Sequence, residues 1–303
     1  MMALGRHIPR QPEDVLVVGF FLAVVAATAI VVVALREDSS GSGQGESSQL
    51  VHIHGLGINP EDDRLYAASH RGLFRIDGRD VAVRVGESYQ DTMGFTVAGP
   101  DRFLASGHPG PRESDFQLEG KPPLLGLIES TDAGANWTSR SLLGQADLHS
   151  LALVDGLIVA YDSTKSRVLV SPNGTTWQTR SEQPLRDLTV NPDDATQMAA
   201  IDPEGNLLRS GDSGRTWAID PTGPGSGLVV RWGRSGIWVG GADGVLHNAD
   251  PISGRWIMTR GFGAPIQALL ITKSDVYVAI AGQGIMRSGN QGERWTVVYD
   301  QGS

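Results

Sequence analysis

A phrase of eight residues recurs in this chain at nearly constant spacing, and it constrains the fold more than any other feature. The phrase reads SGDSGRTW at 210–217, STDAGANW at 130–137 and SGNQGERW at 288–295. A shorter copy lies at 171–177, and a degenerate copy lies at 248–256. The copies end on tryptophans spaced 39 or 40 residues apart, namely Trp137, Trp177, Trp217, Trp256 and Trp295. Such a period in a β-rich sequence is typical of a propeller or a similar array.

The chemistry of the phrase predicts a tight turn. In the copy at 210–217, the Asp212 side chain can accept backbone N–H groups of the residues that follow, which forms an Asx-turn. Gly214 can adopt a positive φ at no steric cost. Trp217 opens the next strand and buries a large apolar surface, while its indole N–H requires a partner. Each copy is therefore interpreted as a hairpin turn with a buried anchor.

The pattern Ser-x-Asp-x-Gly-x-Thr-Trp resembles the Asp-box (BNR) repeat of sialidases and of many other β-propellers. This resemblance implies that each copy joins the third and fourth strands of a blade, on the side away from the active face. The repeat marks a fold and identifies no chemistry.

Each repeat is interpreted as four short strands, so we expect an all-β, six-bladed β-propeller. A content of 39 glycines with only 19% charged residues suits many short strands and tight turns. The predicted blades are 51–86, 91–142, 147–182, 184–221, 226–261 and 265–300. The second blade carries an insertion rich in Pro and Gly at about 108–125. The last blade must then pack against the segment near 49–58 to close the ring.

Composition excludes several classes of function. The chain has no cysteine, which rules out disulfides, thiol catalysis and iron–sulfur clusters. Its formal net charge is −9 and it shows no basic stripe, so we expect no nucleic-acid partner.

The N-terminal residues predict a transmembrane signal anchor. Residues 15–35 carry no charge and are numerous enough to cross a bilayer as a helix. Arg6 and Arg10 precede this segment, and the positive-inside bias places residues 1–14 in the cytoplasm. The alternative is a cleaved signal peptide, with small residues at 27–29 as its cleavage site.

The segment at 36–49 is polar and rich in Gly and Ser, which predicts a flexible linker. Residues 50–303 then form the propeller. We expect a single-pass protein of the cell membrane, with its propeller on the extracytoplasmic side.

Histidines gather at one kind of position in the predicted propeller. By analogy with other propellers, the innermost strand of a blade begins on the functional face and the second strand ends on it. Five of the seven histidines fall at such positions, all in the first three blades. They are His52, His54, His70, His108 and His149. Because side chains alternate along a strand, His52 and His54 are expected to point to the same face.

Three interpretations of these histidines remain open. Imidazoles that converge with carboxylates can bind a borderline metal such as zinc or copper. They can equally hydrogen-bond a polar or anionic ligand, or each can satisfy backbone groups at a blade end. The predicted metal ligands are the five histidines, and Asp91 and Asp162 complete the predicted ligand-binding set. We expect a binding module whose partner is a small ligand, a glycan or a protein.

A second resemblance rests on VHIHGL at 51–56, SHRGLF at 69–74, DTMGF at 91–95 and SGHP at 106–109. These segments are similar to those of a group of bacterial membrane-anchored proteins labelled exo-alpha-sialidase or glycosyl hydrolase-like. The resemblance extends over 50–300 and implies a sialidase-like exo-glycosidase as the alternative function. An assembly or docking factor is a further alternative.

Sialidase chemistry requires three arginines around the substrate carboxylate, a Tyr nucleophile paired with a Glu, and an Asp acid. The Arg-Ile-Pro motif of true sialidases is missing from the first blade, and Tyr161 has no evident Glu partner. Two-carboxylate glycosidase chemistry can instead combine Asp91 with Asp162 or Asp202. The alternative role for these aspartates is to cap turns. The catalytic candidates are Asp91, Tyr161, Asp162 and Asp202.

Overall fold

The computed structural model describes residues 50–111, 113–250 and 253–302, and these residues form six four-stranded antiparallel sheets. The first three sheets consist of β1 (Ile53–Ile58), β2 (Leu65–Ser69), β3 (Gly72–Gly78), β4 (Val81–Arg84), β5 (Asp91–Gly99), β6 (Arg102–His108), β7 (Leu127–Ser130), β8 (Thr138–Ser141), β9 (Leu148–Val154), β10 (Leu157–Asp162), β11 (Arg167–Ser171) and β12 (Gln178–Ser181). The other three consist of β13 (Asp187–Asn191), β14 (Asp194–Ile201), β15 (Leu207–Ser210), β16 (Ala218–Ile219), β17 (Gly227–Gly233), β18 (Gly236–Gly241), β19 (Val245–Ala249), β20 (Trp256–Gly261), β21 (Ile266–Ile271), β22 (Val276–Ile280), β23 (Gly284–Ser288) and β24 (Thr296–Asp300).

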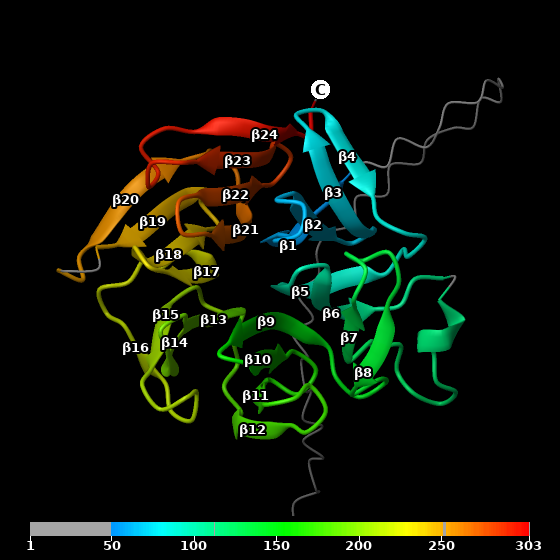
Figure 1. The fold of residues 1–303 in the computed structure, drawn as a ribbon. Coiled ribbons are helices and arrows are strands. Elements are labelled where there is room, and N and C mark those ends of the chain that lie inside the picture. The colour runs from blue at the N-terminus through cyan, green and yellow to red at the C-terminus, as the bar shows by residue number, and fades with distance from the viewer. Residues whose placement is uncertain (1–49, 112, 251–252, 303) are drawn as a thin grey trace, which may run out of the picture. The chain divides into compact units, whose positions relative to one another are not determined.

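The sheets are the blades of a ring, which confirms the predicted all-β, six-bladed β-propeller. The first strand of each sheet lies nearest the centre of the ring and contacts the first strands of both neighbouring sheets (Figure 1). Every sheet is built from consecutive strands, so the ring closes by packing of the last sheet against the first. At this closure the backbone N–H of Asp300 donates to the carbonyl of Arg79 at 2.7 Å, and Gln301 donates to the carbonyl of Leu50 at the same distance.

Burial follows the position of a strand in its blade. All five residues of β2 and all five of β22 are buried, whereas three of the four residues of β8 are exposed. A second strand is covered on both faces by neighbouring blades, which is why these strands read as continuous apolar runs such as VYVAI at 276–280. The outer strands meet water and carry polar residues.

One hydrophobic cluster fills each interface between neighbouring blades. Between the third and fourth blades, for example, Val159 and Val168 pack with Leu188 and Met198. Between the fifth and sixth, Trp238 packs with Leu269 and other buried residues. The core of this propeller is therefore divided among the blade interfaces, and the inner strands surround the centre of the ring (Figure 1).

The repeated phrase forms the turn between the third and fourth strands of its blade. In the copy at 210–217, Ser210 Oγ accepts the backbone N–H of Gly214 at 3.0 Å, and Asp212 Oδ1 accepts that of Thr216 at 3.0 Å. The indole N–H of Trp217 donates to Ser181 Oγ of the preceding blade at 3.1 Å. The phrase thus shapes a turn and also ties two blades together.

The predicted transmembrane segment at 15–35 and the predicted linker at 36–49 lie outside the described residues. Across the described part of the chain, none of the helices has the length and apolar character required to span a bilayer. The predicted insertion leaves β6 after His108 and carries one short 3₁₀ turn, η1 (Ser114–Phe116).

Candidate metal centre

Three histidines of the first blade meet where β1 begins and β2 ends. Because β1 and β2 are antiparallel, Ile53 pairs with Ser69, and this pairing brings His52 and His54 beside His70. His52 precedes β1 with a φ of 51°, which is uncommon for a residue with a side chain. A β-bulge follows between Ile53 and Gly55. The two histidines therefore share a face through this local distortion, and simple strand alternation is the wrong reason for it.

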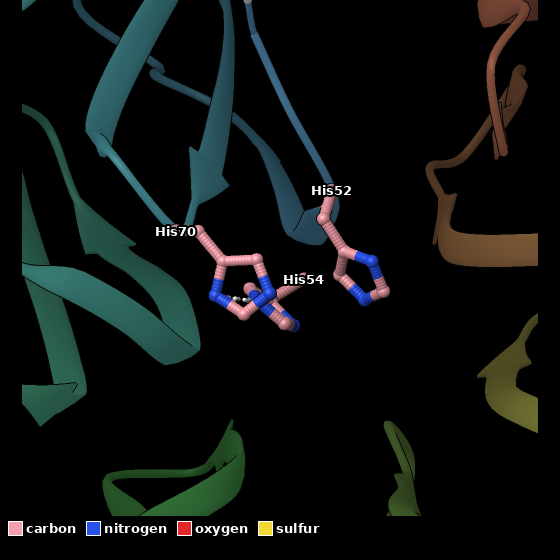
Figure 2. Close-up of side chains that lie close together, drawn as sticks. All are labelled: His52, His54 and His70. Atoms are coloured by element: carbon pink, nitrogen blue, oxygen red, sulfur yellow. Dashed lines mark hydrogen bonds between the residues drawn. The ribbon is translucent and has the colours of Figure 1, made fainter. Parts of the chain in front are cut away.

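The three imidazoles lie close together (Figure 2). Their ring centroids are 4.7 Å apart for His52 and His54, 4.8 Å for His52 and His70, and 4.4 Å for His54 and His70. One ligand atom from each residue lies within 4.8 Å of the other two. His54 Nε2 is 3.3 Å from His70 Nδ1. Two ligands of a tetrahedral zinc ion with bonds of about 2.0–2.1 Å stand at roughly this separation.

Asp91, the first residue of β5, lies beside this triad and supplies a carboxylate from the second blade. Its Oδ1 is 2.7 Å from His70 Nδ1 and 3.7 Å from His54 Nε2. Its Oδ2 faces His108, whose Nδ1 is 3.8 Å away. Asp91 pairs directly with His108 in the β5–β6 hairpin, so their proximity follows from the register of that hairpin.

The third blade adds Asp147 and His149. His149 Nε2 is 2.7 Å from Asp147 Oδ2, and His108 Nε2 is 3.6 Å from the same oxygen. The structure thus brings all five predicted histidines into one continuous row of contacts that runs across three blades through two carboxylates. His54 is the most buried ring, with 11% of its side chain exposed, while His70 keeps 43% exposed.

The sixth blade contacts the other end of this row. The side-chain amide of Gln267 approaches His52 Nδ1 at 3.3 Å, and its Oε1 accepts the backbone N–H of Ile53 at 3.2 Å. Gln267 therefore fixes the start of β1 and positions His52 across the closure of the ring.

The electrostatics of His52 and His54 favour neutral imidazoles. Burial first, and then the neighbouring His70 and His52, lower the pKa of His54 to about 3. Burial and the charge of His70 also lower the pKa of His52, against a smaller opposite effect of Asp91. Only a neutral imidazole can bind a metal through its nitrogen lone pair, so these two rings are ready to act as ligands near neutral pH.

Beside the three histidines of the first blade, interactions between Asp91 and its neighbouring histidines affect pKa values more than burial does. Burial raises the pKa of Asp91, but interactions with His108 and His70 outweigh burial and hold it well below the usual range. The interaction with Asp91 raises the pKa of His108, against burial. Asp91 is therefore an anion next to a row of imidazoles, and it can bind a cation or a protonated histidine.

The other predicted residues, Asp162, Asp202 and Tyr161, make hydrogen bonds that stabilise the fold. Asp162 is fully buried, and its carboxylate accepts hydrogen bonds from Arg167 Nε at 2.8 Å and Thr164 Oγ1 at 2.7 Å. Asp202 accepts both the backbone and side-chain N–H groups of Asn206, at 2.8 and 2.9 Å. Tyr161 lies in the core between the third and fourth blades, where its hydroxyl accepts the Leu185 N–H at 3.0 Å. The structure brings none of these three into contact with the histidines among the hydrogen bonds of the described residues.

Two residues of the site were not predicted to be ligands. Asp147 begins the predicted third blade two residues before His149, and this spacing is the sequence signal that could have identified it. Gln267 is the second residue of β21, as His54 is the second residue of β1. No local feature marks Gln267, because its role depends on closure of the ring.

Comparison with known proteins shows the fold and goes no further. No protein-family model matches the chain, and no curated protein matches its sequence. Among solved structures, it is similar to the GH74 enzyme of Niastella koreensis, at 16% identity and a TM-score of 0.52 over 84% of this chain. The matched region is only 38% of that enzyme's chain.

Two further solved structures show a similar propeller. YCF48 bound to D1 peptide matches at 15% identity and a TM-score of 0.54, over 82% of this chain and 81% of the other. A chain of the nidogen/laminin complex matches at 12% identity and a TM-score of 0.59, over 78% and 93%. Identities this low establish a shared β-propeller architecture, and propellers serve many unrelated functions.

Proposed function

We propose that this protein is a binding module that captures a divalent transition metal, zinc or copper, through His52, His54 and His70. The clustering of three imidazoles at one hairpin, with one ligand atom of each within 4.8 Å of the others, is the observation that carries this proposal. Imidazole suits both metals. Three protein ligands leave a coordination position for water or for an added ligand.

Asp91 lies beside the three-histidine site and contributes a carboxylate to it. Its Oδ1 lies 2.7 Å from a ring nitrogen of His70 and 3.7 Å from one of His54. A carboxylate in this position is a further ligand or a hydrogen-bond acceptor that orients His70. With a metal bound, the exposed side of the triad can accept an anionic group of a small ligand, a glycan or a protein.

The proposed setting is the extracytoplasmic face of a bacterial cell membrane. Residues 15–35 form the proposed anchor, residues 36–49 the linker, and residues 50–303 the propeller of the Asp-box type. The uncharged apolar run at 15–35 and the preceding Arg6 and Arg10 support this arrangement. Protease accessibility of the propeller in spheroplasts tests the orientation, since a propeller in the cytoplasm resists external protease until lysis.

Metal titration of the full-length protein in detergent tests the binding proposal. We expect calorimetry with Zn²⁺ and Cu²⁺ to show binding that His52→Ala/His54→Ala weakens at least a hundredfold, because two of three imidazole ligands are removed. His247→Ala is the matched control, since this histidine lies on β19 in the fifth blade. Absence of binding, or equal affinity in the double variant, would refute the three-histidine site.

The sialidase-like exo-glycosidase stays as the alternative function. The Asp-box resemblance and the GH74 likeness support it, and Asp91 offers a carboxylate at the site. The carboxylates of Asp162 and Asp202 are occupied by hydrogen bonds, which speaks against a two-carboxylate mechanism that uses them. A panel of fluorogenic glycosides that includes sialosides distinguishes the two functions, since the binding module turns over none of them.

The third candidate is a docking or assembly factor. Its support is the likeness to propellers solved with a peptide or in a protein complex. Pull-down from detergent-solubilised membranes, with and without chelator, tests whether a protein partner depends on the metal site.

A further inference from the structure

We propose that the same face holds a second metal subsite, formed by His108, Asp147 and His149, which shares Asp91 with the three-histidine site. This inference rests on the proposed metal-binding function and extends it from one cation to a carboxylate-bridged pair. The arrangement of the four side chains in the second and third blades carries it.

The two oxygens of Asp91 face different histidines. Oδ1 approaches His70 Nδ1 at 2.7 Å and His54 Nε2 at 3.7 Å, on the side of the first blade. Oδ2 approaches His108 Nδ1 at 3.8 Å, on the side of the insertion. A carboxylate placed between two sets of imidazoles can bind one cation through each oxygen, which is the geometry of a bridging ligand.

Asp147 supplies the second carboxylate and is poorly satisfied as the chain stands. Only 5% of its side chain is exposed. Its Oδ2 contacts His149 Nε2 at 2.7 Å and His108 Nε2 at 3.6 Å, and Ser163 Oγ donates to it at 3.2 Å. Its Oδ1 is buried and has no hydrogen-bond partner among the described residues.

A buried carboxylate oxygen without a partner costs free energy, and structures rarely keep one without a reason. The aspartate at the start of the inner strand of the fourth blade is, in contrast, fully satisfied. Asp187, the first residue of β13, accepts hydrogen bonds from Ser150 Oγ, Val230 N and Arg231 Nη1 at 2.6 to 2.9 Å. Asp147 has imidazoles where Asp187 has an arginine, so a cation held by Asp147, His108 and His149 would supply the missing positive charge.

The donor set determines which cation fits. Two imidazoles and two carboxylates are ligands for Zn²⁺, Cu²⁺ and related divalent ions, and they suit Mg²⁺ and Ca²⁺ poorly because these prefer oxygen alone. His108 lies between the two carboxylates, with Nδ1 3.8 Å from Asp91 Oδ2 and Nε2 3.6 Å from Asp147 Oδ2, so one nitrogen faces each of them. His149 and Asp147 are already in contact.

Binding stoichiometry and electron paramagnetic resonance of the full-length protein with Cu²⁺ test the pair. We expect two ions per chain in the wild type and one ion in His108→Ala/His149→Ala. We expect one ion in His52→Ala/His54→Ala as well. The wild-type spectrum at two equivalents should show magnetic coupling that Asp91→Asn removes, because the bridge is lost. His247→Ala is the control for the loss of a histidine elsewhere, and circular dichroism verifies that each variant is folded.

The outcomes separate the two proposals. One ion in the wild type that only His52→Ala/His54→Ala removes would overturn the second subsite and leave the first intact. One ion that only His108→Ala/His149→Ala removes would overturn the three-histidine site and the pair together. No bound ion refutes both, and two ions without magnetic coupling refute the bridge through Asp91.

Discussion

Each of the second, third and fourth blades has an aspartate near the start of its inner strand, and the side chains in contact with that aspartate differ between blades. Asp91 at the start of β5 and Asp147 just before β9 face histidines. Asp187 at the start of β13 faces Arg231, whose Nη1 lies 2.6 Å away, and two backbone N–H groups. Aspartates near the starts of the inner strands therefore have two different surroundings in one ring.

This difference explains why the second and third blades contribute to the candidate site and the fourth does not. Arginine is always charged and donates several hydrogen bonds, so it satisfies Asp187 under all conditions. Histidine can lose its proton and turn a lone pair toward a cation. Carboxylates beside histidines keep the ability to bind something else, whereas the carboxylate beside the arginine has none left.

The largest effect should come from replacing the satisfied carboxylate. We expect Asp187→Ala to lower the free energy of unfolding by about 3–5 kcal/mol, because it leaves Arg231 and the Val230 N–H without their partner. Asp91→Ala in the metal-free protein should cost about 1 kcal/mol, since histidines can become neutral. Urea unfolding in the presence of chelator measures both. Equal losses would show that the two carboxylates have the same structural role.

The next effect is a pH dependence on the histidine side. In metal-free protein we expect the free energy of unfolding to decrease by about 2 kcal/mol from pH 6.5 to pH 5, at about 1.4 kcal/mol for each pH unit. Burial first, and then His70 and His52, lower the pKa of His54 from 6.5 to about 3. In this range the unfolded chain therefore binds a proton at residue 54 that the folded chain does not, and acid favours unfolding.

His108 acts in the opposite direction. Its interaction with Asp91 raises its pKa, so its contribution to stability is complete below 6.5 and is lost as the pH rises through the pKa of the folded state. Urea unfolding at the two pH values should therefore give a flatter dependence in His54→Gln and a steeper one in His108→Gln. If His54→Gln has the wild-type slope, burial of this ring does not control the acid sensitivity.

The smallest effect concerns the boundary between the third and fourth blades. Trp217 of the fourth blade donates its indole N–H to Ser181 of the third. We expect Ser181→Ala to lower the free energy of unfolding by about 1 kcal/mol, the net value of one hydrogen bond, and to leave metal affinity unchanged. Ser139→Ala on the exposed β8 is the control. A change in metal affinity would mean that the rim and the outer turns are coupled.

Most of the fold could be predicted from the repeat. The spacing of the tryptophans gives the blade length, and runs such as LYAAS at 65–69 give the buried second strands. The gathering of His52, His54, His70, His108 and His149 could also be predicted, because antiparallel pairing puts the start of the first strand beside the end of the second. The surroundings of Asp162 and Asp202 could not be predicted. In sequence, an aspartate that accepts hydrogen bonds from neighbouring residues of its own turn cannot be distinguished from one that faces a ligand.

What the sequence by itself determined is the repeating unit, since turn residues and a buried tryptophan act over a few neighbouring residues. Only the tertiary structure decided which side chains meet across blades. Asp91 reaches His70, Asp147 reaches His108, and Gln267 reaches His52 because the ring closes and each inner strand packs against the next. Contacts of this kind depend on the rotation between blades, which no local pattern of residues encodes.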